Sequence, residues 1–204
     1  NIGVEHGNPK FRTEIVGRNY KNEVAIKSFE LIYEAGISTT SNNILGFPDE
    51  TRELVFDTIE LVRKLKSDDI NAFTFIPYQG TSLRGLCETK NYLEKDKLAN
   101  IYETDSLLDM PSISKKEIGG LVKTFPLYAR LPRSYWKDLK IAESDTPEGQ
   151  KIYENLLNIF REQYSNAALA RDWFKFMGIK VLFLYPNTFG MNMLPPAIAT
   201  FSAI

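Results

Sequence analysis

The sequence predicts an α/β fold in which parallel strands alternate with helices and a helical segment follows. Over the first hundred residues, short runs rich in β-branched side chains alternate with stretches of helical periodicity, which is typical of parallel strands joined by crossover helices. After about Leu83 this alternation gives way to helices separated by loops. The chain has 204 residues, 43% of them hydrophobic, so it can bury one core and part of another.

The first predicted strand ends within residues 3–8, Gly-Val-Glu-His-Gly-Asn, and a short helix over residues 10–16 follows it. A longer helix is expected to begin with Asn22 as its cap and to end at Gly36, which favours a left-handed stop. Apolar residues recur near helical spacing between these two limits: Val24, Ala25, Phe29, Ile32 and Ala35.

The second strand is expected over residues 38–45 and the third over residues 71–76. The intervening helix carries an apolar stripe from Leu54 to Leu65. Just before it, the turn over residues 46–51 places acidic residues where a helix amino terminus favours negative charge, so Glu50 is interpreted as a first-turn helix carboxylate. The order is therefore strand, helix, strand, helix, strand.

The second half of the chain is predicted to be mainly helical. Residues 114–117, Ser-Lys-Lys-Glu, match a capping box. A long helix is expected over residues 146–176, with Pro147 in its first turn and a break near residues 165–166. Residues 180–185 are typical of a buried strand, and the chain then continues as a loop and the opening of a helix. The absence of an initiator Met leads us to expect the inside of a longer protein, truncated at both ends.

Composition bounds the partners of this chain. Its formal net charge is -1, from 25 basic and 26 acidic residues, and no basic stripe is present, so we expect no nucleic-acid partner. A single cysteine excludes an internal disulfide and a multi-thiolate metal site made by this chain alone, and we assign no metal ligand. The single cysteine leads us to expect the reducing cytoplasm as the compartment. No apolar run reaches the length of a membrane span, and the first residues lack a basic region followed by an apolar core.

Candidate site residues lie where the predicted strands end. In parallel α/β sheets and barrels, ligands bind at the carboxyl ends of the strands. Three such ends are available, at residues 3–8, 42–51 and 75–81. Each segment alone is weak evidence for a binding site, because a glycine that follows a strand and precedes an acidic helix start is common in turns.

In this order and at this separation, the three segments resemble the fourth, fifth and sixth strands of the radical S-adenosylmethionine barrel, in its cobalamin-binding-domain subgroup. The first segment is similar to the family's G-x-E-S-G-N, with His6 in place of serine. The second resembles the adenine-side motif, with Asp49 where glycine is usual, and the third resembles P-Y-H-G-T, with Gln79 for histidine. The resemblance covers roughly residues 1–164 and includes landmarks of the subgroup's carboxyl-terminal extension at residues 124–128 and 142–143.

The resemblance implies a partial barrel and a division into three parts. Residues 1–90 would form the carboxyl-terminal half of a βα barrel of parallel strands with flanking helices, and residues 91–176 its helical extension. Residues 177–204 look like the start of a cobalamin-binding domain, with an orphan Rossmann-like strand. A half barrel cannot close, so we expect an unpaired strand edge, poor solubility, and the missing amino-terminal half of the barrel as a partner.

The resemblance also implies the cofactors and the residues that meet them. Glu5 and Asn42 would lie near the ribose hydroxyls of S-adenosylmethionine, main-chain groups of Ile44 and Ile76 would meet the adenine, and Arg18 would pair with the methionine carboxylate. A [4Fe-4S] cluster and cobalamin belong to the full-length family member, and their ligands are absent here. No catalytic residue is assigned. The expected reaction is methyl transfer to a small-molecule, natural-product or lipid substrate.

Several readings stay open. Glu5 could be a solvated or capping carboxylate, Arg18 a surface cation and Asn42 a satisfied strand amide. His6 is interpreted as hydrogen-bonded scaffolding, and the remaining two candidates are Cys87, expected to be buried and inert, and Tyr78, which either lines a cavity or packs. At the level of function, the alternatives are a rearranging radical enzyme, a cluster-free βα-barrel lyase or aldolase, and a non-catalytic interaction module.

Overall fold

The structure, a computed structural model, describes residues 1–94, 96–99 and 105–173. Three strands form one parallel sheet in the order β1 (Ile2–Glu5), β2 (Thr40–Leu45) and β3 (Asp69–Thr74). The parallel array predicted from the sequence is confirmed. The third strand begins at Asp69 rather than Asn71, because the backbone of the polar Asp69 already pairs with Thr40.

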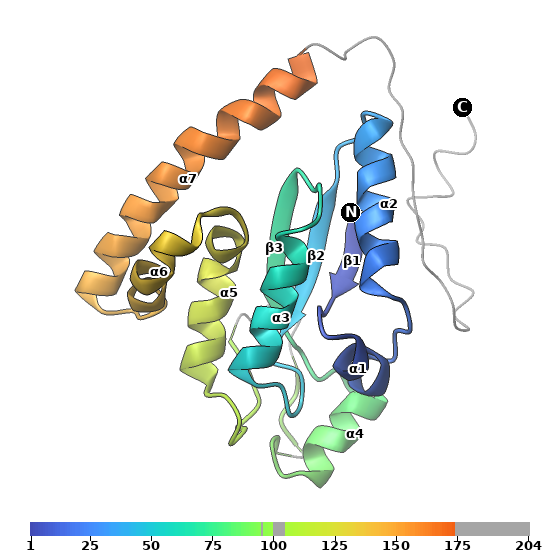
Figure 1. The fold of residues 1–204 in the computed structure, drawn as a ribbon. Helices are drawn as coiled ribbons and strands as arrows, with labels where there is room; N and C mark the ends of the chain where they lie inside the picture. Colours follow the sequence, from blue (N-terminus) through green and yellow to red (C-terminus); the bar gives the residue numbers. More distant parts are fainter. Residues whose placement is uncertain (95, 100–104, 174–204) are drawn as a thin grey trace.

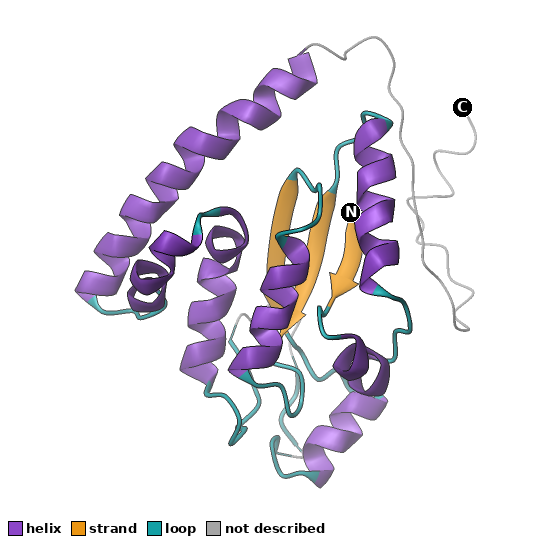
Figure 2. Ribbon diagram, in the orientation of Figure 1, coloured by secondary structure: helices purple, strands orange, loops and turns teal. Residues whose placement is uncertain are grey.

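Helices connect the strands and extend the fold beyond them (Figure 2). A short first helix passes directly into a π-helix, and a 3-10 helix leads into the sixth α-helix. The elements are α1 (Pro9–Phe11), η1 (Arg12–Val16), α2 (Asn22–Glu34), α3 (Arg52–Val62), α4 (Ser82–Thr89), α5 (Lys115–Arg130), η2 (Arg133–Tyr135), α6 (Trp136–Ala142) and α7 (Pro147–Trp173). Within the described residues, none of these helices combines the length and the apolar character needed to span a bilayer.

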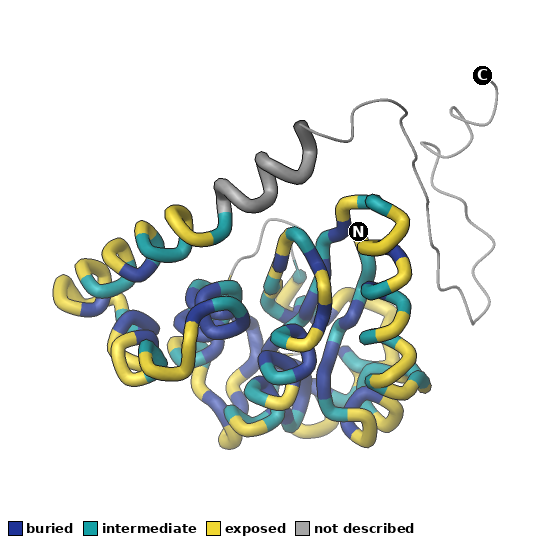
Figure 3. Tube along the Cα trace, turned by 45° about the horizontal axis from the view of Figure 1, so that its top comes forward, coloured by how far each residue is buried: buried dark blue, intermediate teal, exposed yellow. Residues whose placement is uncertain are grey.

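The two faces of the sheet are covered to different degrees. In Figure 1, α3 crosses in front of the strands, α2 lies beside β1, and α5 lies beyond β3 at the other edge of the sheet. Along β2, Ser41, Asn43 and Leu45 are buried, whereas the alternate residues of the strand are only half-buried. Leu45 belongs to the same core as Val55 and Ile59 of α3, so the buried face of β2 is the one beneath that helix. Buried positions run through the strands and the inner sides of the helices (Figure 3).

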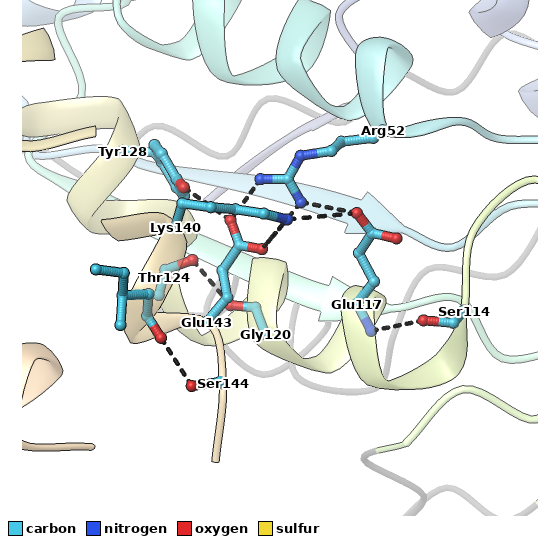
Figure 4. A network of polar contacts seen from close by, with 10 residues as sticks. Arg52, Ser114, Glu117, Gly120, Thr124, Tyr128, Lys140, Glu143 and Ser144 are labelled. Carbon is cyan, nitrogen blue, oxygen red and sulfur yellow. Dashed lines mark hydrogen bonds and ion pairs between the residues drawn. The ribbon is translucent and has the colours of Figure 1, made fainter. Parts of the chain in front are cut away.

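The helical extension packs on the same core as the strands. The core cluster begins at Val4 in β1 and reaches Leu156 in α7. A charged network adds to this apolar contact: Arg52, the first residue of α3, donates to Glu117 of α5 at 2.9 Å and to Glu143, which follows α6, at 2.5 Å (Figure 4). Burial alone would raise the pKa of Glu143, but hydrogen bonds from Arg52 and from the Tyr128 hydroxyl, 2.7 Å away, outweigh it and lower that pKa.

Helix limits agree in part with the sequence. Gly36 adopts φ 75°, the left-handed stop that was predicted, and α7 begins at Pro147. Ser114 accepts a hydrogen bond from the Glu117 amide at 3.2 Å, as in a capping box, but the Glu117 carboxylate bonds to Arg52 instead of closing the box.

Two helix predictions are wrong. The cap of α2 is Lys21, which makes no side-chain cap bond, because the Asn22 side chain binds Arg12 and the Gly7 carbonyl. The helix α7 runs through residues 165–166 without the predicted break, since neither Ser nor Asn removes a backbone donor. The predicted strand at residues 180–185 and the rest of 177–204 lie outside the described residues.

Candidate functional site

The end of β1 presents Glu5 in an unusual backbone conformation. Glu5 has φ 63°, in the left-handed region, and the register with β2 shifts between Gly3 and Glu5. Its side chain folds back over the strand, so that a Cβ built on Gly3 would lie 2.3 Å from the Glu5 Oε1. Glycine at position 3 therefore leaves the space in which the Glu5 carboxylate lies.

Arg18 reaches the same carboxylate from beyond the π-helix. Its Nη2 lies 3.1 Å from the Glu5 Oε1, and its Nη1 donates to the Gly3 carbonyl at 3.4 Å. The Glu5 side chain is 13% exposed and that of Arg18 is 39% exposed. Burial raises the pKa of Glu5, and the nearby guanidinium of Arg18 offsets this only in part. The two residues, predicted to bind different parts of one ligand, thus already form an ion pair.

A cavity of about 650 Å3 opens at the carboxyl ends of the strands. Four of the five predicted cofactor-binding residues line it: Glu5, Arg18, Ile44 and Ile76. Asn42 is not among its lining residues, and its Oδ1 accepts a hydrogen bond from Asn71 at 3.2 Å. The structure therefore brings four of the five candidates together and places the fifth beside them on the sheet.

Aromatic side chains complete the wall of this cavity. Phe47, Phe73, Phe75 and Tyr78 all line it, and the Phe47 and Phe75 rings contact each other at a centroid distance of 5.0 Å. Phe73 is 51% exposed and Tyr78 44% exposed, so both offer apolar surface to a ligand. Of the two readings of Tyr78, the one that places it on a cavity is the one observed. The phenylalanines were missed because nothing in their spacing separates a cavity wall from a core.

The loop between β2 and α3 is organised around Glu50. This side chain is fully buried and accepts hydrogen bonds from the amides of Gly46 and Phe47, the latter at 3.1 Å. The interpretation of Glu50 as a first-turn helix carboxylate is wrong, because Thr51 caps α3 and Glu50 lies before it, facing inward. Asp49, which departs from the glycine of the motif that this loop resembles, has φ 65° and bonds to Lys90 and Tyr92.

His6 joins this loop to the end of β1. Its Nε2 lies 3.0 Å from the Glu50 Oε1, and its Nδ1 accepts a hydrogen bond from the Asn8 amide at 3.0 Å. The side chain is fully buried. The prediction that His6 is hydrogen-bonded scaffolding is confirmed.

A buried cation beneath the site was missed by sequence reasoning. Arg12 is fully buried and donates to the His6 carbonyl at 2.7 Å, to Asn22 at 2.8 Å and to the Tyr20 carbonyl. Its guanidinium lies 3.7 Å from the centroid of the Tyr20 ring, and burial lowers its pKa. The Tyr20 hydroxyl in turn donates to the Val4 carbonyl at 2.5 Å. No local sequence pattern predicts this cluster, because its contacts link residues that do not belong to the same helix or strand.

Cys87 lies in α4 and is fully buried. Burial raises the pKa of its thiol to about 11, so the thiolate that binds metals is disfavoured, as expected for an inert cysteine. Among the described residues, no group of three or more His, Cys, Asp or Glu side chains is arranged to hold a metal ion.

Comparison with known proteins points to one superfamily. Residues 1–62 match the sequence model of the radical SAM superfamily. An uncharacterized methyltransferase of Pyrococcus horikoshii is 26% identical over 139 residues, which is 68% of this chain and 30% of that protein. Two proteins named tRNA-2-methylthio-N(6)-dimethylallyladenosine synthase also match: that of Halalkalibacterium halodurans is 33% identical over 82 residues, and that of Syntrophomonas wolfei 35% identical over 75 residues.

The matched region is a part of each protein. It spans 39% and 36% of this chain for the two synthases, and 15% and 17% of the synthases themselves. Thus the chain spans less than a third of the length of these relatives. The segment from β1 to α3, which carries Glu5, Arg18, Asn42 and Ile44, is similar to the radical SAM superfamily.

Proposed function

We propose that the cavity at the carboxyl ends of the strands binds S-adenosylmethionine, as part of a radical SAM enzyme that transfers a methyl group. The observation that carries this proposal is the convergence of Glu5, Arg18, Ile44 and Ile76 on one cavity of about 650 Å3. Cavities of a few hundred to about 1,000 Å3 are typical of cofactor sites. The superfamily match over residues 1–62 supports the choice of cofactor.

The chemistry of the lining fits the cofactor. A guanidinium binds a carboxylate through two charge-assisted hydrogen bonds, so Arg18 is suited to the methionine carboxylate. Glu5 can accept hydrogen bonds from ribose hydroxyls. Ile44, Phe47 and Ile76 offer an apolar surface to the adenine, and the Ile76 carbonyl, which already accepts from the Tyr78 amide at 3.0 Å, has a second lone pair. Asn42 stays in the proposal as a neighbour of the ribose.

The iron–sulfur cluster does not fit this chain. Such clusters are held by several cysteine thiolates, and the chain has one cysteine, buried and with a raised thiol pKa. We propose that the cluster ligands lie in an amino-terminal half of the barrel. Cobalamin as a second cofactor rests on the sequence motifs alone, with residues 177–204 outside the described part of the chain.

Methyl transfer is favoured among the reactions open to the superfamily. One relative is named an uncharacterized methyltransferase, and two others are named tRNA-2-methylthio-N(6)-dimethylallyladenosine synthase. For this chain we propose a small-molecule, natural-product or lipid substrate in the cytoplasm. Its balanced charge, with a formal net value of -1, offers no general attraction to a nucleic acid.

The residues that line the same cavity, and its binding of a cofactor, distinguish the alternative functions. A cluster-free lyase or aldolase would need a lysine or metal-binding carboxylates at the strand ends, and among the described residues the cavity lining includes one carboxylate, Glu5, and no lysine. A non-catalytic interaction module needs no cofactor at all. Binding of S-adenosylmethionine therefore distinguishes the leading proposal from that module.

The test is equilibrium dialysis of the purified chain with radiolabelled S-adenosylmethionine. A charge-assisted hydrogen bond contributes roughly 1.5–3 kcal/mol, so Arg18→Ala should weaken binding about tenfold to a hundredfold. Arg133→Ala is the matched control, since Arg133 pairs with Glu60 at 2.7 Å and does not line the cavity. Wild-type affinity in Arg18→Ala, or no binding by the unchanged chain, would contradict the proposal.

A further inference from the structure

We infer that His6 is a positioning residue for the candidate site, and that it acts by donating a hydrogen bond to Glu50. The contact joins two segments that line the cavity, the end of β1 and the loop after β2. This inference rests on the proposed function, because it assigns His6 a role in aligning the groups that would bind the cofactor. It concerns two fully buried side chains that do not line the cavity.

The hydrogen bonds around His6 fix the direction of the contact. The Asn8 amide can only donate, and it donates to Nδ1 at 3.0 Å, so Nδ1 carries no hydrogen. The ring hydrogen is therefore on Nε2, which lies 3.0 Å from the Glu50 Oε1. His6 thus acts as a donor toward the loop after β2 and as an acceptor toward the chain that follows β1.

The other carboxylate oxygen of Glu50 organises the loop itself. It accepts hydrogen bonds from the Phe47 amide at 3.1 Å and from the Gly46 amide. Gly46 has φ 87°, and Phe47 lines the cavity next to Ile44. The Phe47 ring also meets the His6 ring edge-on, with 6.4 Å between centroids. Glu50 therefore holds the loop in the shape that presents Phe47, and His6 anchors Glu50.

On the opposite side, His6 is joined directly to Glu5, the carboxylate on the cavity wall. The residues that follow are fixed on α3: the Gly7 amide donates to Thr58 at 2.9 Å, and a Cβ on Gly7 would lie 2.2 Å from the Asp57 carbonyl. Arg12 holds the His6 carbonyl at 2.7 Å. With its backbone fixed in this way, the His6 side chain determines how the loop after β2 lies relative to Glu5.

Two substitutions separate the two hydrogen bonds of His6. The amide nitrogen of glutamine can replace Nε2, so His6→Gln keeps a donor toward Glu50. The shorter asparagine can replace only Nδ1, so His6→Asn keeps the acceptor for the Asn8 amide and loses the bond to Glu50. Both variants lose the ring, which contacts Phe11 at a centroid distance of 4.5 Å. Their difference therefore sets the contact with Glu50 against the contact with the Asn8 amide, with the loss of the ring common to both.

The first readout is the affinity for S-adenosylmethionine in equilibrium dialysis of the 204-residue chain. His6→Asn is expected to bind about tenfold more weakly than His6→Gln, and His6→Gln within about threefold of the unchanged chain. Tyr128→Phe serves as a control for lost stability, because it removes a buried hydrogen bond to Glu143 away from the cavity. Equal affinities of the two His6 variants would overturn the inference.

The second readout needs no ligand and separates this inference from the proposed function. His6 is the single histidine, so nitrogen NMR of a histidine-labelled chain reports its ring without assignment. The hydrogen should be found on Nε2, and the Gly46 and Phe47 amides should exchange faster in His6→Asn than in His6→Gln. If the unchanged chain binds no S-adenosylmethionine, the proposed function fails while faster exchange in His6→Asn still supports the positioning role. A hydrogen on Nδ1, equal exchange in both variants, or failure of His6→Gln as well as His6→Asn to fold would overturn it.

Discussion

Two glutamates near the strand ends have opposite surroundings. Glu50 is fully buried, and its carboxylate is satisfied by two amides and an imidazole. Among the residues that the structure describes, Glu5 pairs with one charged side chain, that of Arg18, and it lines the cavity. Burial raises the pKa of Glu5 despite that partner, so the charged carboxylate is less stable in the folded protein than in water. Glu5 is therefore the residue at which binding and stability should oppose each other.

The variant Glu5→Gln tests this opposition. A carboxyl whose pKa is raised in the folded state contributes stability below its unfolded value, here 4.5, and loses that contribution as pH rises through the folded pKa. We expect Glu5→Gln to be more stable than the unchanged chain at pH 7 and the difference to shrink below pH 4.5, as measured by urea unfolding. A less stable variant at pH 7 would contradict this assignment.

The sequence identified the candidate residues better than it identified their contacts. Glu5, Ile44 and Ile76 lie at predicted strand ends, and the family resemblance named them together with Arg18, which follows the short helix after the first strand. The contact between Glu50 and His6 could not be predicted, because the two residues are 44 positions apart and only the fold brings them together. The same holds for Arg12, whose acceptors are two main-chain carbonyls and the Asn22 side-chain oxygen, all outside its own helix.

At the scale of elements, the strands and most helices were predictable because their periodicity and turn residues agree. The first and last residues of these strands and helices were harder to predict. Asn22 has the chemistry of a cap but bonds instead to Arg12, a tertiary contact that overrides a local preference. The second strand begins at Thr40 rather than residue 38, which moves no side chain to the other face.

Two adjacent glycines in α5 give a test of close packing. A Cβ on Gly120 would lie 2.5 Å from the Glu143 carbonyl oxygen, whereas a Cβ on Gly119 would meet nothing within 4 Å. Gly119→Ala should therefore stabilise the fold by about 1 kcal/mol through helix propensity. Gly120→Ala should destabilise it by roughly 1–3 kcal/mol, because the backbone after α6 must move. Thermal unfolding of both variants decides the matter, and effects of the same sign would show that α5 and α6 are not packed as described.

At the scale of the whole molecule, the helical extension and the βα array share one core and one charged network. Whether residues 1–90 and 91–176 are separate domains stays a prediction, but Arg52 bonds across that boundary to Glu117 and Glu143. The Arg52 side chain is 23% exposed and that of Glu143 only 7%. Because the Glu143 carboxylate is so buried, its charged form depends on the ion pair with Arg52.

We expect Arg52→Met to lower the free energy of unfolding by about 2–3 kcal/mol at pH 7, since it leaves Glu143 without its main partner. The lowered pKa of Glu143 means that its contribution is present above its unfolded value of 4.5 and is lost as pH falls through the folded pKa. The deficit of the variant should therefore narrow in acid, as urea unfolding at pH 7 and pH 4 would measure. Arg133→Ala, at an exposed ion pair, should cost less than about 1 kcal/mol, and an equal loss there would argue against a special role for Arg52.

One helix, α3, contacts both the helical extension and the segment that follows β1. Its first residue, Arg52, bonds to the helical extension, and about one and a half turns further along Asp57 and Thr58 bond to the segment that carries His6. A shortened chain that stops at residue 90 would strip the acidic partners from Arg52 beside the Thr51 cap and the Glu50 loop. A piece that keeps the contacts of both ends of α3 must therefore continue past Glu143, even though, among the described residues, every residue on the cavity wall except Val122 precedes residue 90.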